Sequence, residues 1–567
     1  MRRARALVDA LAAVAARFGP EDRAAKLRLL GELAACPIGS AGLLLRLHEA
    51  LCFLQAYPDD GEVLAHVELA LGGLATRVAR LGPARRERLS DSGVAGTTLD
   101  YPFGLPMARW LHRHFGSDVD VRWRSFERGE QLEEALRLLV THAEDDAFSE
   151  GGMGWRRWLR DARGGRRLSD LGLLLELFER VPLPGAVRDV LFESLALPIE
   201  WRLRRGVSRT GAKLPWARPF FHGAGLQRTG VDFVAEVLRP LSGLRRAPRP
   251  LAESLIQAAR AALATRLREL HAFAHANPDD VLVVDPGRGL RIALIGLSPA
   301  FRLPLEGYYA FLVLKNGVPV SYGGGWQLFG ALELGLNIFA SFRQGESALV
   351  FAQVLRAYRV TLGMRTVVID RYQLGHENAE ALRSGAFYFY DRLGFRPRDP
   401  AVLAVLAAER RKLAADPRYR SPLPVLGRLA GAETYLTLPG GSPEPETRLR
   451  SSQIAALVSR AIARGFGGDR ARAVREARSR VAAALGVRRR DSWSPGERLA
   501  FERLSVVTAL IPDLERWPST DRGRLLAILR AKGGGSERRY TRLLDGHRRL
   551  QRSLEALVAG AVSAWRP

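Results

Sequence analysis

The spacing of hydrophobic residues divides the chain into three regions. In residues 4–276, apolar positions recur every three or four residues, for example in 131–142, 168–181 and 186–204, which predicts a mainly helical region. Residues 441–567 show the same helical spacing, with many arginines and no strand pattern. Between these regions, short runs of β-branched and aromatic residues predict strands. We therefore expect a domain of strands and helices flanked by two helical regions.

The predicted strands lie close together in the middle of the chain, at 281–284, 290–297, 308–314, 318–322 and 331–339. Lys315-Asn316-Gly317 indicates a hairpin, because Asn and Gly adopt positive φ at low cost. The turn residues Asn277-Pro278-Asp279-Asp280 follow a helix that we expect to end near His275. An antiparallel meander is therefore expected to begin after a domain boundary at this turn.

The pattern changes again after the meander. It predicts a helix at 347–362, a strand at 366–370, and a second helix that ends at Gly394 in a left-handed conformation. A helical insertion at about 399–430 precedes a last strand at 434–438. The expected fold class is α+β, with a mixed, mostly antiparallel sheet. The expected domains are 1–276, 277–440 and 441–567.

The net charge of the chain indicates which kinds of partner it could bind. The chain of 567 residues has a formal net charge of +26, and only five of its 86 basic residues are Lys. An excess of this size favours nucleic acid, phosphate-bearing cofactors or an anionic membrane surface. The basic residues are spread along the whole chain, so an origin in composition alone, without any such partner, stays open.

The cysteines and histidines exclude several classes of site. Cys36 and Cys52 give no disulfide framework or zinc cluster, which indicates a reducing compartment. His271 and His275 have the spacing of a metal pair but lack a third ligand, so we expect no metal. No run approaches the ~20 apolar residues that cross a bilayer. We expect a cytoplasmic protein, with association to the inner face of the membrane as a further hypothesis.

Two motifs carry the candidate chemistry. Leu336-Asn337-Ile338-Phe339-Ala340-Ser341-Phe342-Arg343 ends the last strand of the meander, and Gln344-Gly345-Glu346-Ser347 leads into the next helix. With this order of elements, residues of about 279–438 resemble the GNAT superfamily of N-acyltransferases. In that family the strand splays from its neighbour, and the loop turns its amides toward the pyrophosphate of coenzyme A. A helix start supplies unpaired amides and a positive dipole end for such an anion.

The resemblance implies that acyl-coenzyme A is the donor substrate. The positions implied to bind it are Ile338, Phe339, Arg343, Gln344, Gly345, Glu346, Ser347 and Ala348. The loop is one residue shorter than the family pattern, and a carboxylate at position 346 is unfavourable beside pyrophosphate unless it points away. An interaction protein that binds coenzyme A without turnover is therefore an alternative.

The second motif is Ala386-Phe387-Tyr388-Phe389-Tyr390-Asp391-Arg392-Leu393-Gly394-Phe395, which resembles the last motif of the family. The resemblance places Tyr390 at the general acid. When an amine attacks the thioester, the departing thiolate needs a proton, which a phenol can donate. Alternatively, Tyr388 and Tyr390 are only packed aromatic side chains. Asn378 resembles the family's cofactor-binding Asn, with a longer spacing.

A general base for the amine is harder to assign. Glu333 is our candidate, because strand alternation points it away from the face of Leu332 and Leu334. His376 and Glu377, in the loop before the second helix, are the second choice. An ordinary paired or solvated strand residue remains the alternative for position 333.

The resemblance implies an acyl-coenzyme A-dependent N-acyltransferase that acts on an amine acceptor, and region 1–276 is a candidate for binding that acceptor. One hypothesis is that a long acyl chain is moved to a lipid amine, by analogy with bacterial enzymes that acylate a sphingoid base. The rival prediction is a nucleic-acid-binding or interaction protein with a degenerate acyltransferase fold, in which residues 470–490 and 538–549 contact phosphates.

Overall fold

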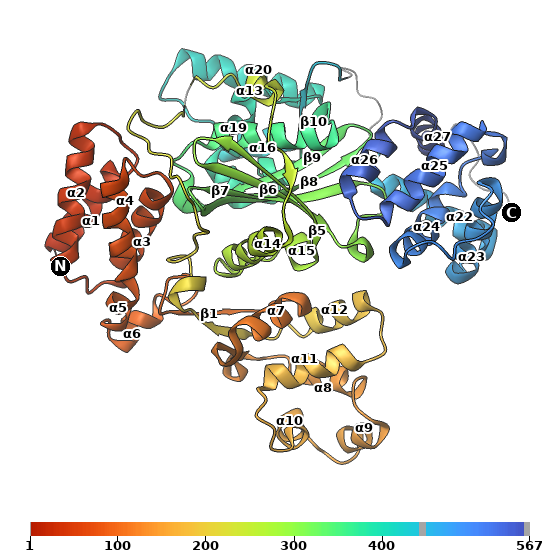
Figure 1. Cartoon of the computed structure of the whole chain (residues 1–567), viewed down its shortest axis with the longest axis horizontal. Coiled ribbons are helices and arrows are strands. Elements are labelled where there is room, and N and C mark those ends of the chain that lie inside the picture. The colour runs from red at the N-terminus through yellow and green to blue at the C-terminus, as the bar shows by residue number, and fades with distance from the viewer. Residues whose placement is uncertain (1, 229, 442–448, 561–567) are drawn as a thin grey trace.

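The computed structural model describes residues 2–228, 230–441 and 449–560. The chain forms an α+β fold with a nine-stranded mixed sheet at its centre and a separate three-stranded sheet (Figure 1). Helical regions lie on either side of the large sheet, at the two ends of the molecule (Figure 1). Of the helices in these ranges, none is both long enough and apolar enough to cross a lipid bilayer.

The first helices of the chain pack against the large sheet instead of forming a core of their own. Buried residues such as Leu51 and Tyr57 belong to the same hydrophobic cluster as the strands. This helical group consists of α1 (Arg2–Val14), α2 (Pro20–Ala35), α3 (Ala41–Ala56), α4 (Gly61–Gly72), α5 (Leu74–Ala79) and α6 (Pro83–Glu87).

Residues 98–203 form a unit with its own hydrophobic cluster, centred on the fully buried Trp201. Its three-stranded antiparallel sheet has the order β1-β3-β2. The unit contains β1 (Thr98–Tyr101), α7 (Leu105–Phe115), β2 (Val119–Val121), α8 (Gly129–Arg137), α9 (His142–Ser149), α10 (Trp155–Arg163), α11 (Asp170–Arg180), α12 (Gly185–Ser194) and β3 (Ile199–Arg202).

The large sheet has the order β11-β12-β10-β9-β8-β7-β6-β5-β4. Its neighbours are antiparallel except for the parallel pair of β9 and β10, so the sheet is mixed and mostly antiparallel, as expected. The strands are β4 (Arg245–Arg246), β5 (Ala276–Gly287), β6 (Leu290–Leu297), β7 (Gly307–Lys315), β8 (Val318–Leu328), β9 (Ala331–Ile338), β10 (Thr366–Ile369), β11 (Arg396–Pro397) and β12 (Thr434–Thr437).

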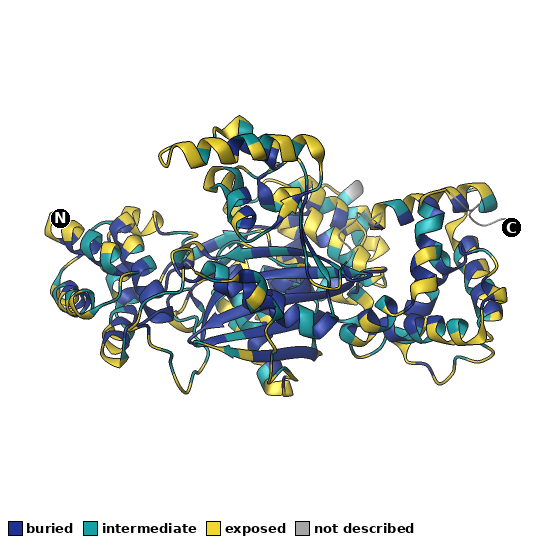
Figure 2. Ribbon diagram, turned by 90° about the horizontal axis from the view of Figure 1, so that it is seen from above, coloured by how far each residue is buried: buried dark blue, intermediate teal, exposed yellow. Residues whose placement is uncertain are grey.

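Helices cover both faces of this sheet (Figure 1). The pair α14 and α15 lies on one face, while α16 and α19 lie on the other. Burial follows these layers, because the strands are dark and the outer sides of the helices are light in Figure 2. The helices are α13 (Phe233–Leu238), α14 (Arg249–Ala264), α15 (His271–Ala274), α16 (Ser347–Leu362), α17 (Arg371–Leu374), α18 (Ala379–Ser384), α19 (Ala386–Arg392), α20 (Pro400–Ala415) and α21 (Leu423–Leu429).

The C-terminal helices have a third hydrophobic cluster and are joined to the sheet by buried polar contacts. Arg302, which is 6% exposed, donates to the carbonyl oxygens of Lys532 and Gly534, each at 2.7 Å. The amide of Glu537 donates to Asp280 on β5 at 2.8 Å. These helices are α22 (Ser451–Phe466), α23 (Arg470–Ala484), α24 (Pro495–Thr508), α25 (Ser519–Lys532), α26 (Glu537–Asp545) and α27 (Arg548–Val558).

Two local expectations are wrong. The segment 277–280 is not a turn but part of β5, where the pairing with β6 shifts in register between Ala276 and Val281. A bulge tolerates turn residues inside a strand, which explains the error. The helix expected at 186–204 ends at Ser194, and Ile199–Arg202 forms β3, because its buried and less buried side chains alternate.

Candidate functional site

The parallel strands β9 and β10 pair over only a short distance. The paired residues are Ala331 with Thr366, Leu332 with Val367 and Glu333 with Val368. Residues 334–338 of β9 continue beyond this ladder without a described strand on that edge. The strand edge there has backbone groups that need another partner. The pairing of the two strands therefore ends before the point where β9 leads into α16.

The first turn of α16 lies at this end of β9. No side chain caps the helix, and the amide of Val350 is the first to bond back, to the carbonyl of Glu346 at 2.9 Å. Ser347 and Ala348 are half-buried, whereas Arg343 and Gln344 are exposed. The amides of a first turn and the dipole of a 16-residue helix together favour an anion. The structure therefore groups Arg343, Gln344, Ser347 and Ala348 around a positive helix end.

Arg343 also connects the loop to α18. Its guanidinium donates to Glu380 at 2.6 Å, and both side chains are more than half exposed. Asn378 is the N-cap of the same helix: it accepts from the amide of Ala381 at 3.1 Å, and it donates to the carbonyl of Tyr372 at 3.2 Å. The side-chain amide of Asn378 is thus occupied by two hydrogen bonds within the protein, one of which caps α18.

Glu346 points away from this surface. Its carboxylate is fully buried and lies 3.0 Å from the ammonium of Lys315, which is also fully buried. It contacts Arg288 and accepts from the amide of Gln227 at 3.0 Å. Burial alone would raise the pKa of Glu346, but Lys315 and these hydrogen bonds hold the pKa below its ordinary value. The side chain that looked unfavourable for pyrophosphate is therefore part of the protein interior.

Gly345 is covered by the N-terminal helices. A Cβ at this position would lie 2.6 Å from the hydroxyl oxygen of Tyr57, a residue that is 1% exposed. The glycine is therefore required for close packing between the loop and the residue that follows α3. The contact of Tyr57 with this loop could not be predicted, because Tyr57 lies almost 290 positions away in a helical pattern.

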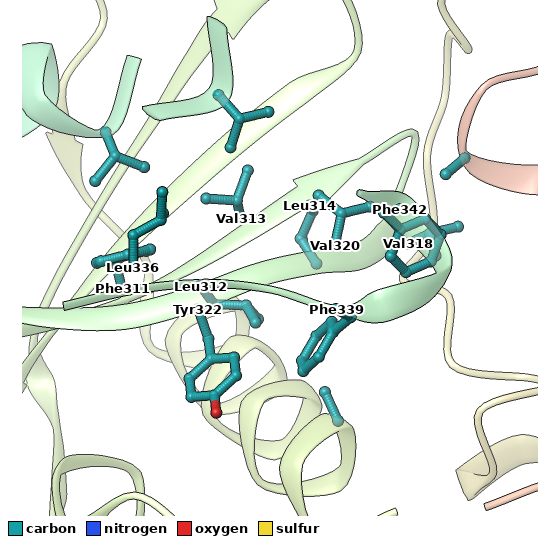
Figure 3. Packing of buried hydrophobic residues seen from close by; sticks show 14 of the residues in the cluster. Phe311, Leu312, Val313, Leu314, Val318, Val320, Tyr322, Leu336, Phe339 and Phe342 are labelled. Atoms are coloured by element: carbon teal, nitrogen blue, oxygen red, sulfur yellow. The ribbon is translucent and has the colours of Figure 1, made fainter. Parts of the chain in front are cut away.

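Ile338 and Phe339 differ in their surroundings. Ile338 is half-buried where β9 ends, opposite Ser321 of β8. Phe339 is 4% exposed and stacks on Tyr322, with the ring centroids 5.2 Å apart (Figure 3). The guanidinium carbon of Arg266, which follows α14, lies 3.8 Å from the centroid of the Phe339 ring. Phe339 is thus a core residue, and only its backbone could serve a ligand.

Tyr390 and Tyr388 lie on different sides of α19, as their spacing predicts. Tyr390 is 4% exposed, and its ring centroid lies 5.8 Å from that of Phe351 and 5.7 Å from that of Phe395. Burial raises the pKa of Tyr390 well above its ordinary value, so its phenol keeps its proton. The hydroxyl of Tyr388 is 2.7 Å from that of Ser421.

Glu333 faces the opposite side of the sheet from Tyr390. A Cβ at Gly325, which pairs with Leu334, would meet Tyr358 of α16, so Leu334 faces α16 and Glu333 faces away. Tyr390 packs against Phe351 of α16. The structure therefore does not bring the two predicted catalytic side chains to one face.

Glu333 lines a cleft of about 570 Å³ between the sheet and the C-terminal helices. Trp326, Glu333, Val368 and Tyr435 occupy matching positions on four adjacent strands and form a row on this face. The guanidinium carbon of Arg398 lies 4.1 Å from the ring centroid of Tyr435. The other wall comes from the start of α22 and from α27.

The second choice for the base is less enclosed. His376 is half-buried, Glu377 is exposed, and neither lines this cleft. Sequence reasoning missed the cleft itself, because one wall comes from strands of the sheet and the other from helices of the C-terminal region, which show only helical spacing. Among the described residues, no group of three or more His, Cys, Asp or Glu side chains is arranged to hold a metal ion.

Comparisons with known proteins add no assignment: no family model, no curated protein and no solved structure matches this chain.

Proposed function

We propose that the chain is an acyl-coenzyme A-dependent N-acyltransferase with a GNAT-like domain over about residues 279–438. The observation that carries the proposal is the early end of the pairing between β9 and β10, beyond which β9 leads to the uncapped first turn of α16. The pyrophosphate of coenzyme A would bind the amides of Ser347 and Ala348, near Arg343. Its amide-containing arm would then bind the strand edge at 334–338.

This placement of coenzyme A is compatible with Tyr390 and Glu333 lying on opposite faces of the sheet. A thioester held beside β9, where its pairing with β10 ends, would be accessible from α19 on one face and from the cleft on the other. Tyr390 would donate the proton to the departing thiolate, and its raised pKa keeps that proton in place. The amine would enter from the cleft, where Glu333 would accept its proton. A protein that binds coenzyme A without turnover remains the second candidate, because the ring of Tyr390 packs among aromatic side chains as a core residue would.

The first test concerns the donor. Native mass spectrometry of the purified chain, incubated with coenzyme A, acetyl-coenzyme A or palmitoyl-coenzyme A, should show a one-to-one complex. Ala348→Asp should weaken that complex at least tenfold by calorimetry, because it brings a negative charge to the pyrophosphate. The helix itself should tolerate the substitution, since an acid in the first turn is favourable. Ala401→Asp makes the same change at the exposed start of α20 and should leave binding unchanged.

The second test concerns turnover, followed as release of the coenzyme A thiol in the presence of a panel of amines. Tyr390→Phe should lower the rate by ~10² to 10⁴ if the phenol is the general acid, while donor affinity stays the same. Tyr388→Phe is the matched control and loses only a hydrogen bond to Ser421. A complex with coenzyme A but no thiol release by the unmodified chain would favour the binding protein over the enzyme.

A further inference from the structure

Positive charge is concentrated in one short stretch of the C-terminal helices. Residues 451–490 contain ten arginines and two acidic residues, Asp469 and Glu476, so these 40 residues carry a net charge of +8 out of +26 for the whole chain. This stretch forms α22, α23 and the segment after α23. It lies at the C-terminal end of the molecule, away from the large sheet (Figure 1). Residues 516–555 have a net charge of +7, from 11 basic and four acidic residues, so 451–490 differs from them mainly in having only two acidic residues.

These arginines are exposed and almost entirely without counter-charges. Arg478 forms an ion pair with Glu502 at 3.3 Å, and it is the only one of the ten with an ion-pair partner among the described residues. Seven of the ten are exposed to solvent on α22, on α23 and directly after α23: Arg460, Arg464, Arg470, Arg472, Arg475, Arg488 and Arg489. Unpaired like charges at this density repel one another, so a bound polyanion would relieve the repulsion.

The position of the charges on α23 also favours an anionic ligand. Arg470 and Arg472 lie in the first turn of the helix, where the helix dipole disfavours cations. Asp469 caps this turn by accepting from the amide of Arg472 at 2.9 Å, and no other acid lies in the turn. The arrangement therefore costs stability in the protein alone, and a ligand of opposite charge would offset that cost.

The apolar side of α23 is already occupied. Ala473, Ala477 and Val481 are completely buried where α23 packs on α24, and the last two belong to the C-terminal cluster. None of the large hydrophobic residues that are exposed on the described chain lies between 449 and 490. A helix that binds a bilayer inserts an apolar face into the headgroup region, and α23 has none available. The surface therefore fits a partner recognised by phosphate charge alone.

We propose that α22, α23 and the arginines after them form a nucleic-acid-binding surface that contacts the phosphate backbone without reading bases. A helix of 15 residues is about 22 Å long, a length over which duplex DNA presents about a dozen phosphate charges. Arginine matches phosphate with two parallel hydrogen bonds. This inference does not depend on acyl transfer, and it applies equally if the GNAT-like domain only binds its ligand.

The test uses the full chain and a fluorescently labelled 30-base-pair DNA duplex, with binding followed by anisotropy between 50 and 300 mM salt. The triple variant Arg470→Gln, Arg472→Gln, Arg475→Gln should bind at least tenfold more weakly at 100 mM salt. Its plot of log affinity against log salt should lose about 2.7 from the slope, at about 0.9 for each lost phosphate contact.

The matched control removes three exposed arginines from α10, Arg156→Gln, Arg157→Gln and Arg160→Gln, and so changes the net charge by the same amount. It should bind DNA like the unmodified chain. Equal losses in the two triple variants would overturn the proposal, because net charge alone would then explain binding. If the α23 variant does not fold, Arg488→Gln with Arg489→Gln replaces it and should lose about 1.8 from the slope.

A second experiment distinguishes a lipid surface from nucleic acid as the source of the phosphate groups. Vesicles containing phosphatidylserine should sediment little of the unmodified chain at 100 mM salt. Strong sedimentation that is lost in the α23 variant, together with no binding to duplex DNA or to a single-stranded RNA of the same length, would overturn the assignment in favour of a membrane. Failure of the unmodified chain to bind any of these probes at 50 mM salt would refute it outright.

Discussion

The buried pair of Lys315 and Glu346 allows a quantitative test of how the candidate loop is held. Their charged atoms are 3.0 Å apart, and both side chains are fully buried. Glu346→Gln keeps the shape of the side chain and an acceptor for the amide of Gln227, but leaves the ammonium without its counter-charge. Breaking a buried pair in this way costs about 3 to 5 kcal/mol. A core of this size shifts its melting temperature by about 2 to 4 °C per kcal/mol, so we expect a loss of about 6 to 20 °C.

The assay is differential scanning fluorimetry of four proteins: the unmodified chain, each single variant and the double variant Lys315→Met with Glu346→Gln. The double variant has no unpaired buried charge and should recover most of the loss, giving a coupling energy in the double-mutant cycle. Glu380→Gln is the control, because it removes the exposed ion pair of Arg343 and should cost at most about 1 kcal/mol.

A melting temperature of Glu346→Gln within about 1 °C of the unmodified chain would show that the pair does not hold the loop. If this variant keeps its stability but loses coenzyme A affinity tenfold, the carboxylate acts at the ligand instead. pH supplies a further check. Since the pKa of Glu346 is lowered in the folded protein, its contribution is complete above the ordinary range for glutamate and is lost as pH falls through the lowered pKa.

Two further predictions address other parts of the molecule. Burial would raise the pKa of Glu49, but a hydrogen bond to His48 and the charge of Arg209 lower it from 4.5 to about 2. Its stabilising effect should be lost as pH falls from 4.5 to 2, so Glu49→Gln should flatten the acid-unfolding curve in that window by about 2 kcal/mol, after a discount for partial exposure. Trp201→Ala should destabilise the unit of residues 98–203 by about 3 to 5 kcal/mol, seen as an earlier melting transition that leaves the main core unchanged.

The local elements of the central region could be predicted closely from the sequence. The helix expected at 347–362 has those bounds, and the hairpin at Asn316 and Gly317 has positive φ at both residues. Both signals are local: the apolar spacing of one helix and the conformational freedom of two turn residues. The α+β class and the mostly antiparallel sheet follow from the same pattern and are confirmed.

The surroundings of the candidate site could not be predicted in this way. Tyr57 closes over Gly345, and α27 forms one wall of the cleft at Glu333, although both come from regions that show only helical spacing. Amphipathic spacing shows that a helix has a face to bury but not which surface covers it. The three-stranded sheet was missed for a related reason, because its strands are at most four residues long.

The three hydrophobic clusters also lead to a prediction about which parts of the chain are separable. All buried members of the second cluster except Ala264 of α14 lie within residues 98–203, and the chain enters and leaves this unit at one place, since the amide of Leu203 donates to the carbonyl of Thr97 at 2.9 Å. Replacing 98–203 with a short Gly-Ser bridge should therefore leave the rest folded, with its melting transition within a few degrees.

Deleting residues 1–94 should have the opposite result, although it removes a segment of similar length. These helices contribute their apolar side chains to the cluster of the large sheet, and their loss would expose the surface that Tyr57 and its neighbours cover. Burial of apolar surface is worth roughly 25 cal/mol per Å², so we expect the loss of the surface buried by these helices to exceed the net stability of a typical domain. We expect insoluble or protease-sensitive protein, measured by limited trypsin digestion of the two shortened chains side by side. Equal resistance of both to digestion would show that the first helices are a separate layer and not part of the core that holds the candidate loop.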